Sequence, residues 1–408
     1  MKKPILRSVQ LRNFKAIQNS KTIRLSPLTV FIGNNGSGKS SVIEGLMTYQ
    51  MIVDQDLESA MNYWRGFRYI RNQAVKHPLE QTNTDRNYEK NPIEFKVSYQ
   101  THTLTIAITA SPDGQVFIYE EILEISKQAK FRRDLVGKIY FQDLKPPEQI
   151  EPNVKSQSSE EYIGSCPDDL SMLTTNIVQE RLRQLNRIDV YYQILEWQFL
   201  NLNPTVIGDP ISPRLTSKQV KLAPDASNLS QYLLDIYKQD QDVFDGIVET
   251  LQYVIPYASD LQAQTTSQAE LESRVYLKLT EQKFYIPGWL LSTGTLRITA
   301  LLSLLRHPQP PPLIMIEEIE NGLDPRSINL IVDEIREVIE SGKTQVMLTT
   351  HSPYLLDLLN LSHIILVERD ETGQPVLSRP IDQQSLSTWS EQFAPGQLYT
   401  MGQLNTKR

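Results

Sequence analysis

Cysteine is almost absent from this chain of 408 residues, and Cys166 is its one copy. A single cysteine excludes an internal disulfide bond and is typical of a reducing compartment, so we expect a cytoplasmic protein. One cysteine and five dispersed histidines also leave no ligand set for a structural zinc site. Stability must therefore come from a hydrophobic core, for which the length is ample.

Long hydrophobic runs are missing as well. No stretch approaches the roughly 18 uncharged apolar residues that cross a bilayer, so we expect no membrane-spanning segment. Lys2, Lys3 and Arg7 stand near the start, but no apolar core follows them. This pattern does not predict a secretory signal.

Positive charge does not dominate, because 41 Lys and Arg face 48 Asp and Glu, a net charge of −7. A protein that coats DNA non-specifically is usually basic, so any binding to nucleic acid needs a local patch. Arg65, Arg68 and Arg71 recur at every third residue, with aromatic residues between them. They could form a phosphate-backbone patch, but an ordinary solvated helix face is the favoured interpretation.

What the sequence does contain is a complete phosphate-binding loop at residues 33–40, Gly-Asn-Asn-Gly-Ser-Gly-Lys-Ser. An apolar strand over 28–33 and a helix from 40 to about 51 flank it, which is the context such a loop requires. Its glycines let backbone N–H groups approach phosphate oxygens. Lys39 is expected on the β- and γ-phosphates and Ser40 on Mg²⁺. The nucleotide contacts predicted in this loop are Asn34, Asn35, Gly36, Ser37, Gly38, Lys39, Ser40 and Ser41.

The last third of the chain offers three further candidates. A buried strand over 314–316 ends in Glu317 and Glu318, and His351 follows a strand over 345–350. Between residues 291 and 305, an apolar helix begins at a serine- and threonine-rich stretch that can cap it. Its N-terminus is a second anion site, useful only if it meets the γ-phosphate held by another copy. The residues predicted there are Ser292, Thr293, Gly294 and Thr295.

Periodicity predicts an α/β fold made of three parts. Residues 1–126 are expected to hold the loop, an edge strand over 5–14 and an antiparallel meander over 94–100, 102–110 and 116–125. Residues 127–285 are predicted as a mostly helical insertion, with helices near 173–185, 227–239 and 241–254 and no persistent heptad. Residues 286–408 should return to the parallel core, with a helix over 326–341 and strands over 344–350 and 363–368.

Together these motifs resemble the ABC-type AAA ATPases of the RecF, SMC and OLD-like superfamily, and most closely the stand-alone ATPases related to OLD-type heads. The stretches that carry the resemblance are residues 11–16, 31–41, 291–297, 317–325 and 350–353. Residues 222–229 and 395–398 also look familial. The resemblance covers both ends of the chain well and the middle loosely.

The resemblance implies roles for individual residues. Glu317 takes the Mg²⁺-organising position, where the family has aspartate, and Glu318 takes the general-base position. Asp324, six residues further on, matches the D-loop aspartate, and His351 matches the γ-phosphate sensor. The family's Mg²⁺-sensing glutamine leads into the insertion, and Gln142 is the candidate here.

The resemblance also implies a P-loop ABC-type head, split by the insertion, that forms a homodimer or higher homo-oligomer around ATP and Mg²⁺. It implies work on DNA repair or anti-phage defence, with DNA or a separate nuclease or effector as partner. OLD nucleases carry a further C-terminal domain, and only 57 residues (408 − 351) follow His351, so we expect no intrinsic nuclease.

Two other functions remain open. A slow or non-hydrolysing scaffold is compatible with Glu317 in place of aspartate. The nucleotide-binding subunit of a transporter is opposed by the Asn13-Phe14-Lys15 start, the long middle segment and the Glu-Glu pair.

Overall fold

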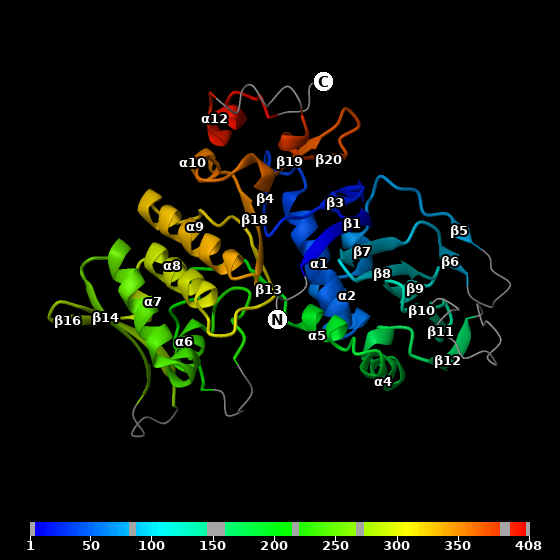
Figure 1. Ribbon diagram of the computed structural model, residues 1–408, viewed down its shortest axis with the longest axis horizontal. Coiled ribbons are helices and arrows are strands. Elements are labelled where there is room, and N and C mark those ends of the chain that lie inside the picture. Colours follow the sequence, from blue (N-terminus) through cyan, green and yellow to red (C-terminus); the bar gives the residue numbers. More distant parts are fainter. Residues whose placement is uncertain are drawn as a thin grey trace.

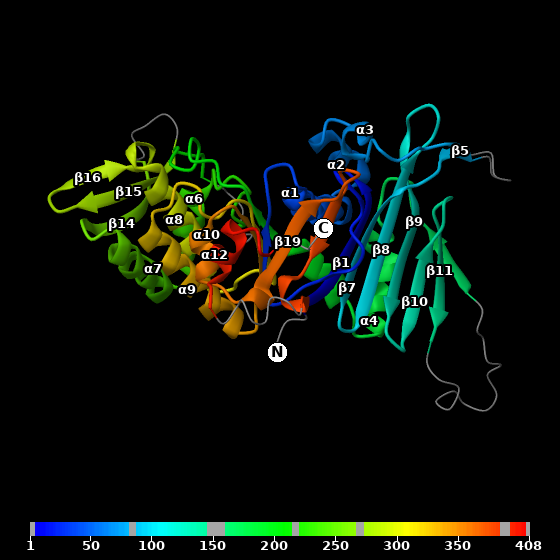
Figure 2. The same cartoon turned by 90° about the horizontal axis from the view of Figure 1, so that it is seen from above.

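A computed structural model describes residues 5–80, 87–144, 160–213, 220–266, 273–383 and 392–404. A six-stranded sheet runs through the middle of the molecule (Figure 1). A long antiparallel sheet lies on one side of it, and a layer of helices with a small third sheet lies on the other (Figures 1 and 2). No described helix is both long and apolar enough to cross a membrane.

The central sheet has the order β13-β17-β18-β4-β19-β20. Its first five strands are parallel, and β20 pairs antiparallel with β19. The strands are β4 (Leu28–Ile32), β13 (Gln198–Leu200), β17 (Leu313–Ile316), β18 (Gln345–Thr350), β19 (Ile364–Arg369) and β20 (Pro375–Ser378). The chain thus assembles this sheet from segments more than 300 residues apart, and the sequence prediction of buried parallel strands in the last third is confirmed.

Side chains of the parallel strands alternate between two cores, because successive residues of a strand point to opposite faces. Phe31 packs with α1 (Lys39–Asp54), whereas Val30 and Ile32 pack with α8 (Thr293–Leu305) and α9 (Pro325–Glu340). Helix α1 therefore covers one face of the sheet and helices α8 and α9 cover the other (Figure 1).

The long antiparallel sheet contains nine strands over the described residues. They are β1 (Leu6–Phe14), β2 (Ile17–Asn19), β3 (Ile23–Arg24), β7 (Ile93–Tyr99), β8 (His102–Ala110), β9 (Val116–Ile125), β10 (Ala129–Arg133), β11 (Lys138–Asp143) and β12 (Glu161–Ser165). The predicted meander is present as β7, β8 and β9. The prediction of an edge strand over 5–14 is wrong, because β1 pairs with β7 on one side and with β2 and β3 on the other.

The sheet does not stop at residue 126, where the sequence pattern placed a boundary. Strand β10 pairs with β9 in register and β11 and β12 extend the same ladder, so backbone hydrogen bonds cross that position. The segment 127–285 is also not mostly helical. Its helices are α4 (Asn176–Gln184), α5 (Asp189–Leu195), α6 (Leu229–Gln239) and α7 (Gln241–Val254), and its third sheet is β14 (Ala258–Thr265), β15 (Val275–Glu281) and β16 (Phe284–Pro287).

Short elements complete the fold. They are α2 (Leu57–Tyr63), α3 (Phe67–Ile70), α10 (Pro353–Asp357), α12 (Pro395–Thr400), the strand pair β5 (Leu79–Glu80) and β6 (Tyr88–Glu89), and the 3-10 turns η2 (Met172–Thr174), η3 (Gly288–Leu290), η4 (Leu361–His363) and η5 (Pro380–Asp382). Helices α10 and α12 lie against each other beside β19 (Figure 1).

Candidate functional site

The phosphate-binding loop joins the central strand β4 to α1, as its sequence predicts. Gly36 and Gly38 have φ values of 72° and 109°, a region that favours glycine because a Cβ atom is strained there. Gly38 is the N-cap of α1 and no side chain caps it, so the helix presents open N–H groups. This is an anion-binding geometry at the carboxyl edge of a parallel sheet.

Lys39 is folded into the loop. Its ammonium donates to the carbonyl oxygens of Gly33 (2.7 Å) and Asn34 (3.0 Å), and the residue is 5% exposed. Burial lowers the pKa of Lys39, and the charges of Glu318 and Glu320 oppose that shift. Phosphate oxygens are stronger acceptors than neutral carbonyls, so a triphosphate can draw the ammonium out of its present contacts.

Glu317 lies directly across from the first turn of α1. The Ser40 side chain lies beside its carboxylate, and the amide of Asn201 donates to its Oε2 at 3.1 Å. Its Oε1 is buried and without a hydrogen-bond partner. Burial raises the pKa of Glu317, and the nearby charge of Glu44 adds to the effect. A buried carboxylate oxygen that lacks a donor is a ready ligand for a cation.

These groups fit Mg²⁺ at a nucleotide. Mg²⁺ takes oxygen ligands and is usually held by one or two protein groups together with phosphates and water. Ser40 and Glu317 are two such groups in contact. Within the described residues there is no cluster of three or more His, Cys, Asp or Glu side chains that could hold a metal without a nucleotide.

Glu318 has an unusual backbone for a glutamate, with φ at 46°. Its N–H donates to the Thr349 hydroxyl on β18 (2.9 Å), and the Asn321 amide donates to its carboxylate. A non-glycine residue in this region carries strain of order 1–3 kcal/mol, and such strain clusters at functional sites. The exposed Glu318 carboxylate leaves β17 beside the loop, within electrostatic range of Lys39.

His351 follows β18, the strand that lies between β17 and β4. Its backbone N–H donates to Glu320, so the segment after the acidic strand and the segment after β18 are tied together. The topology therefore brings Lys39, Ser40, Glu317, Glu318 and His351 to one edge of one sheet. Their individual roles stay predictions.

The residues predicted to bind the γ-phosphate held by a second copy lie at the start of α8. Ser292 caps α8 by accepting from the N–H of Thr295 (3.1 Å), and Thr293 is exposed. Gly294 approaches the D-loop of its own chain, because a Cβ atom there would lie 2.7 Å from the carbonyl oxygen of Gly322. Helices α8 and α1 cover opposite faces of the sheet, and a cation near the start of each, Arg297 and Lys39, lies within electrostatic range of Glu318.

Asp324 acts as the N-cap of α9. Its carboxylate accepts from the N–H groups of Arg326 (2.8 Å) and Ser327 (3.1 Å) and from the Ser327 hydroxyl (2.9 Å). The side chain thus already stabilises a helix terminus. A contact with nucleotide across a dimer stays a prediction for this residue.

Two sequence interpretations are wrong. Gln142 lies on β11, opposite Lys130 of β10 in the antiparallel sheet, and not beside the loop. The arginine patch is not formed, because α3 spans four residues and Arg71 is 6% exposed, paired with Glu89 and donating to the Lys90 carbonyl. Only Arg65 and Arg68 are exposed.

Sequence analysis missed Asn201 and Lys15 as site residues. Asn201 follows the three-residue strand β13, which is too short to show a pattern, yet β13 pairs with β17 and so brings Asn201 to Glu317. Lys15 lies in residues 11–16, which carry the family resemblance, but the sequence suggested no function for its side chain. Its ammonium pairs with Glu44 (2.8 Å), lies 3.4 Å from the Trp64 ring centroid and is near the charge of Glu317.

Comparison with protein families gives two matches. Residues 5–187 match the family described as "AAA ATPase domain", and residues 208–357 match the one described as "AAA domain, putative AbiEii toxin, Type IV TA system". No curated protein matches the chain.

Several solved structures align with the chain over most of their length. A Smc head bound to the C-terminal winged-helix domain of ScpA has a TM-score of 0.45 at 14% identity, covering 92% of this chain and 98% of that one. The SMC head domain from Thermotoga maritima has 0.39 at 12%, covering 92% and 98%. A Smc head with an extended coiled coil, bound to the C-terminal domain of ScpA from Pyrococcus furiosus, has 0.45 at 12%, covering 95% and 99%.

The two family matches lie on either side of the segment that carries Asn201, and each contains part of the site: the phosphate-binding loop in one, the acidic strand and His351 in the other. The central sheet joins these parts at its carboxyl edge. The chain therefore resembles AAA ATPase domains in both matched segments, and these segments contain the loop, the acidic strand and His351.

Proposed function

We propose that the chain is an ATP-hydrolysing switch in which two copies close head-to-tail around ATP and Mg²⁺ and open after hydrolysis. The observation that carries the proposal is the contact between Ser40 of the phosphate-binding loop and Glu317 of the acidic strand. It joins the triphosphate end of the loop to the carboxylates that organise hydrolysis in such a site.

Each group has a task that its surroundings support. Lys39 binds the β- and γ-phosphates after leaving the Gly33 and Asn34 carbonyls. Ser40 and Glu317 would hold Mg²⁺, which when bound neutralises phosphate charge. Glu318 accepts a proton from the attacking water, and His351 donates to the γ-phosphate.

The capped N-terminus of α8 supplies the partner copy's phosphate site. Its N–H groups can stabilise the γ-phosphate of an ATP that another chain holds. We further propose that closure is passed to DNA or to a separate nuclease or effector in DNA repair or anti-phage defence. Because Arg71 is buried and paired with Glu89, residues 65–71 do not support direct contact with DNA.

A slow or non-hydrolysing scaffold is the second candidate. Glu317 replaces the shorter aspartate, and the Asn321 amide is bonded to Glu318 and competes with water for that carboxylate. This arrangement would favour binding over turnover.

The test is turnover by Glu318→Gln. We expect it to retain ATP in equilibrium dialysis but to release phosphate about 10²–10⁴-fold more slowly, because an amide holds water and cannot accept its proton. Glu340→Gln, on the exposed end of α9, is the matched control and should keep the wild-type rate. Equal rates in Glu318→Gln and wild type would remove Glu318 from this role, and a wild type that binds ATP without turnover would favour the scaffold.

A further inference from the structure

The hairpin formed by β19 and β20 backs the phosphate-binding loop at each of its three glycines. At Gly33 a Cβ atom would lie 2.1 Å from the carbonyl oxygen of Val367, and at Gly38 it would lie 3.0 Å from the Pro375 ring. At Gly36 the contact is a hydrogen bond from Arg369, described next. The loop therefore rests on one continuous piece of chain, which we name the support hairpin (residues 364–378).

Arg369 reaches the tip of the loop. Its Nε and Nη2 donate to the carbonyl oxygen of Gly36 at 2.9 and 2.6 Å, and its Nη1 donates to the carbonyl of Gly373 in its own turn. That turn is fixed locally, because Asp370 accepts from the N–H groups of Thr372 and Gln374, each at 2.9 Å. The guanidinium is thus bonded both to the Gly373 carbonyl of its own turn and to the Gly36 carbonyl of the loop.

The bonded carbonyl matters because a trans peptide is planar, with its C=O and N–H groups pointing in opposite directions. Holding the Gly36 carbonyl outward turns the N–H of Ser37 toward the interior of the loop, where it now donates to the Asn34 carbonyl at 3.1 Å. Gly36 is exposed, and no atom lies within 4 Å of where its Cβ would be, so packing does not fix this peptide.

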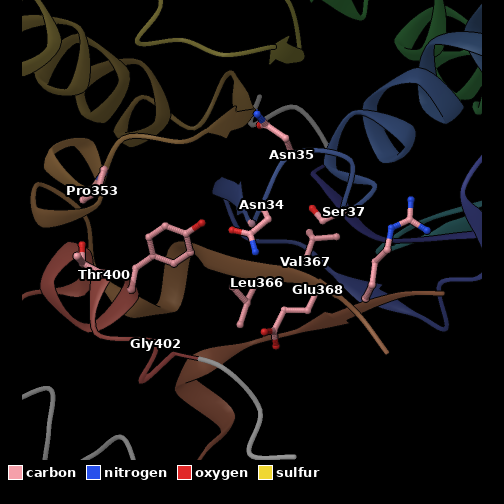
Figure 3. Close-up of a pocket in the computed structure, with 12 residues that line it drawn as sticks. Asn34, Asn35, Ser37, Pro353, Leu366, Val367, Glu368, Thr400 and Gly402 are labelled. Atoms are coloured by element: carbon pink, nitrogen blue, oxygen red, sulfur yellow. The ribbon is translucent and has the colours of Figure 1, made fainter. Parts of the chain in front are cut away.

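Space next to the loop strengthens this conclusion. A pocket of about 630 Å³ separates the loop and the end of β19 from α10 and α12. Figure 3 shows Asn34 and Ser37 on the loop side of it, and Pro353 and Thr400 on the far side. Since no packed side chains fill this space, the support hairpin is the element that holds the loop on this side.

We infer that Arg369 is a positioning residue for nucleotide binding: it holds the Gly36 peptide so that the loop N–H groups face the phosphates. In this inference Arg369 acts through the loop, by way of the Gly36 carbonyl. The inference rests on the proposed ATP-binding function and adds to it a residue from a strand that carries no nucleotide motif.

The experiment compares full-length Arg369→Met, Arg369→Lys and Arg336→Met. Methionine keeps the length of the side chain and removes its donors, and lysine restores charge and one donor group. Arg336 on α9 is the matched control, since it too is exposed and donates to a backbone carbonyl, that of Leu358. The measurements are the Kd for ATP and for ADP by equilibrium dialysis, KM and kcat for hydrolysis, and the melting temperature.

We expect Arg369→Met to raise both Kd values about tenfold, the lower end for hydrogen bonds from a charged donor because the group is exposed. KM should rise with kcat nearly unchanged, since the loop holds ground and transition state alike. Arg369→Lys should recover part of the affinity, and the melting temperatures should stay within about 2 °C of wild type, because an exposed site contributes little to stability.

Unchanged Kd values in Arg369→Met would overturn the inference. An equal loss of nucleotide affinity in Arg336→Met would also overturn it. The same holds if both Arg369 variants melt at temperatures low enough for unfolding to explain their weaker binding. A wild type that does not bind ATP would instead overturn the proposed function, which the wild-type titration reveals before any variant is compared.

Discussion

At the scale of single residues, Glu317 is surrounded by groups of three kinds. Ser40 supplies a hydroxyl, Asn201 supplies an amide donor at 3.1 Å, and Lys15, which also pairs with Glu44, supplies a nearby positive charge. Only the hydroxyl belongs to a nucleotide motif. Neighbours that orient a metal ligand commonly matter almost as much as the ligand, so Asn201 should influence Mg²⁺ binding.

Asn201→Ala should weaken the response to Mg²⁺ because Glu317 loses the donor that fixes its Oε2. We expect hydrolysis at limiting Mg²⁺ to fall about 10–100-fold, and part of the loss should recover at high Mg²⁺. A Mg²⁺ titration of phosphate release measures this. Asn203→Ala is the control from the same loop, since Asn203 contacts Thr205 and not Glu317. Overlapping titrations for Asn201→Ala and wild type would contradict the prediction.

At the scale of elements, β8 begins with a buried histidine that makes the antiparallel sheet sensitive to pH. His102 is 3% exposed, stacks on Tyr99 of β7 with ring centroids 4.5 Å apart, and has an Nε2 without a partner. Burial, followed by the charge of Arg187, lowers the pKa of His102 from 6.5 to about 4. Between these two values the unfolded chain binds a proton that the folded sheet does not.

Stability should therefore fall as the pH drops below about 6.5, because protonation favours the unfolded state until the folded pKa is reached. We expect His102 to contribute a loss of about 2 kcal/mol in the free energy of unfolding between pH 7.5 and 5. Urea titrations at both pH values measure it. Between these two pH values, the free energy of unfolding of His102→Gln should fall by about 2 kcal/mol less than that of the wild type. The fall for His77→Gln should equal that of the wild type. The same pH dependence in His102→Gln and wild type would refute this assignment.

At the scale of the whole molecule, the two helix ends proposed to bind phosphate begin helices on opposite faces of the central sheet. Because the sheet lies between the bodies of α1 and α8, we expect that a single chain does not place both N-termini on one triphosphate. Two copies arranged head-to-tail can do so, which is the geometric support for a dimer. A closed cyclic pair would contain two composite sites.

Mixing two inactive variants tests this arrangement. Lys39→Ala should disable the loop, and Thr293→Asp should place a negative charge at the exposed N-terminus of α8, against the partner's phosphate. Thr293 is preferable to Gly294, where any side chain meets the Gly322 carbonyl of the same chain. In a mixed dimer one site carries both lesions and the other carries neither. We expect up to half of the wild-type activity per mixed dimer.

The control is each variant alone, which should be inactive. No recovery in a mixture whose exchange is demonstrated by two affinity tags would argue against shared sites. Full activity in a wild type that light scattering finds monomeric with ATP would do the same.

The sequence alone determined the features whose physics is local. The path of residues 33–41 depends on glycines and on the helix that starts at Lys39, and α9 depends on an apolar stripe with Asp324 at its cap, all within a few residues of each other. The same holds for the alternation of β7, β8 and β9. Short-range spacing predicts these elements because the forces that form them act between near neighbours.

Tertiary structure decided which distant residues meet. Asn201 reaches Glu317 across 116 positions because β13 pairs with β17, and Arg369 reaches Gly36 across 333 positions because β19 pairs with β4. Arg71, at the end of α3, does not join the expected patch because it pairs with Glu89 on strand β6. Strand order and the burial of charge are properties of the assembled sheets, and no local spacing encodes them.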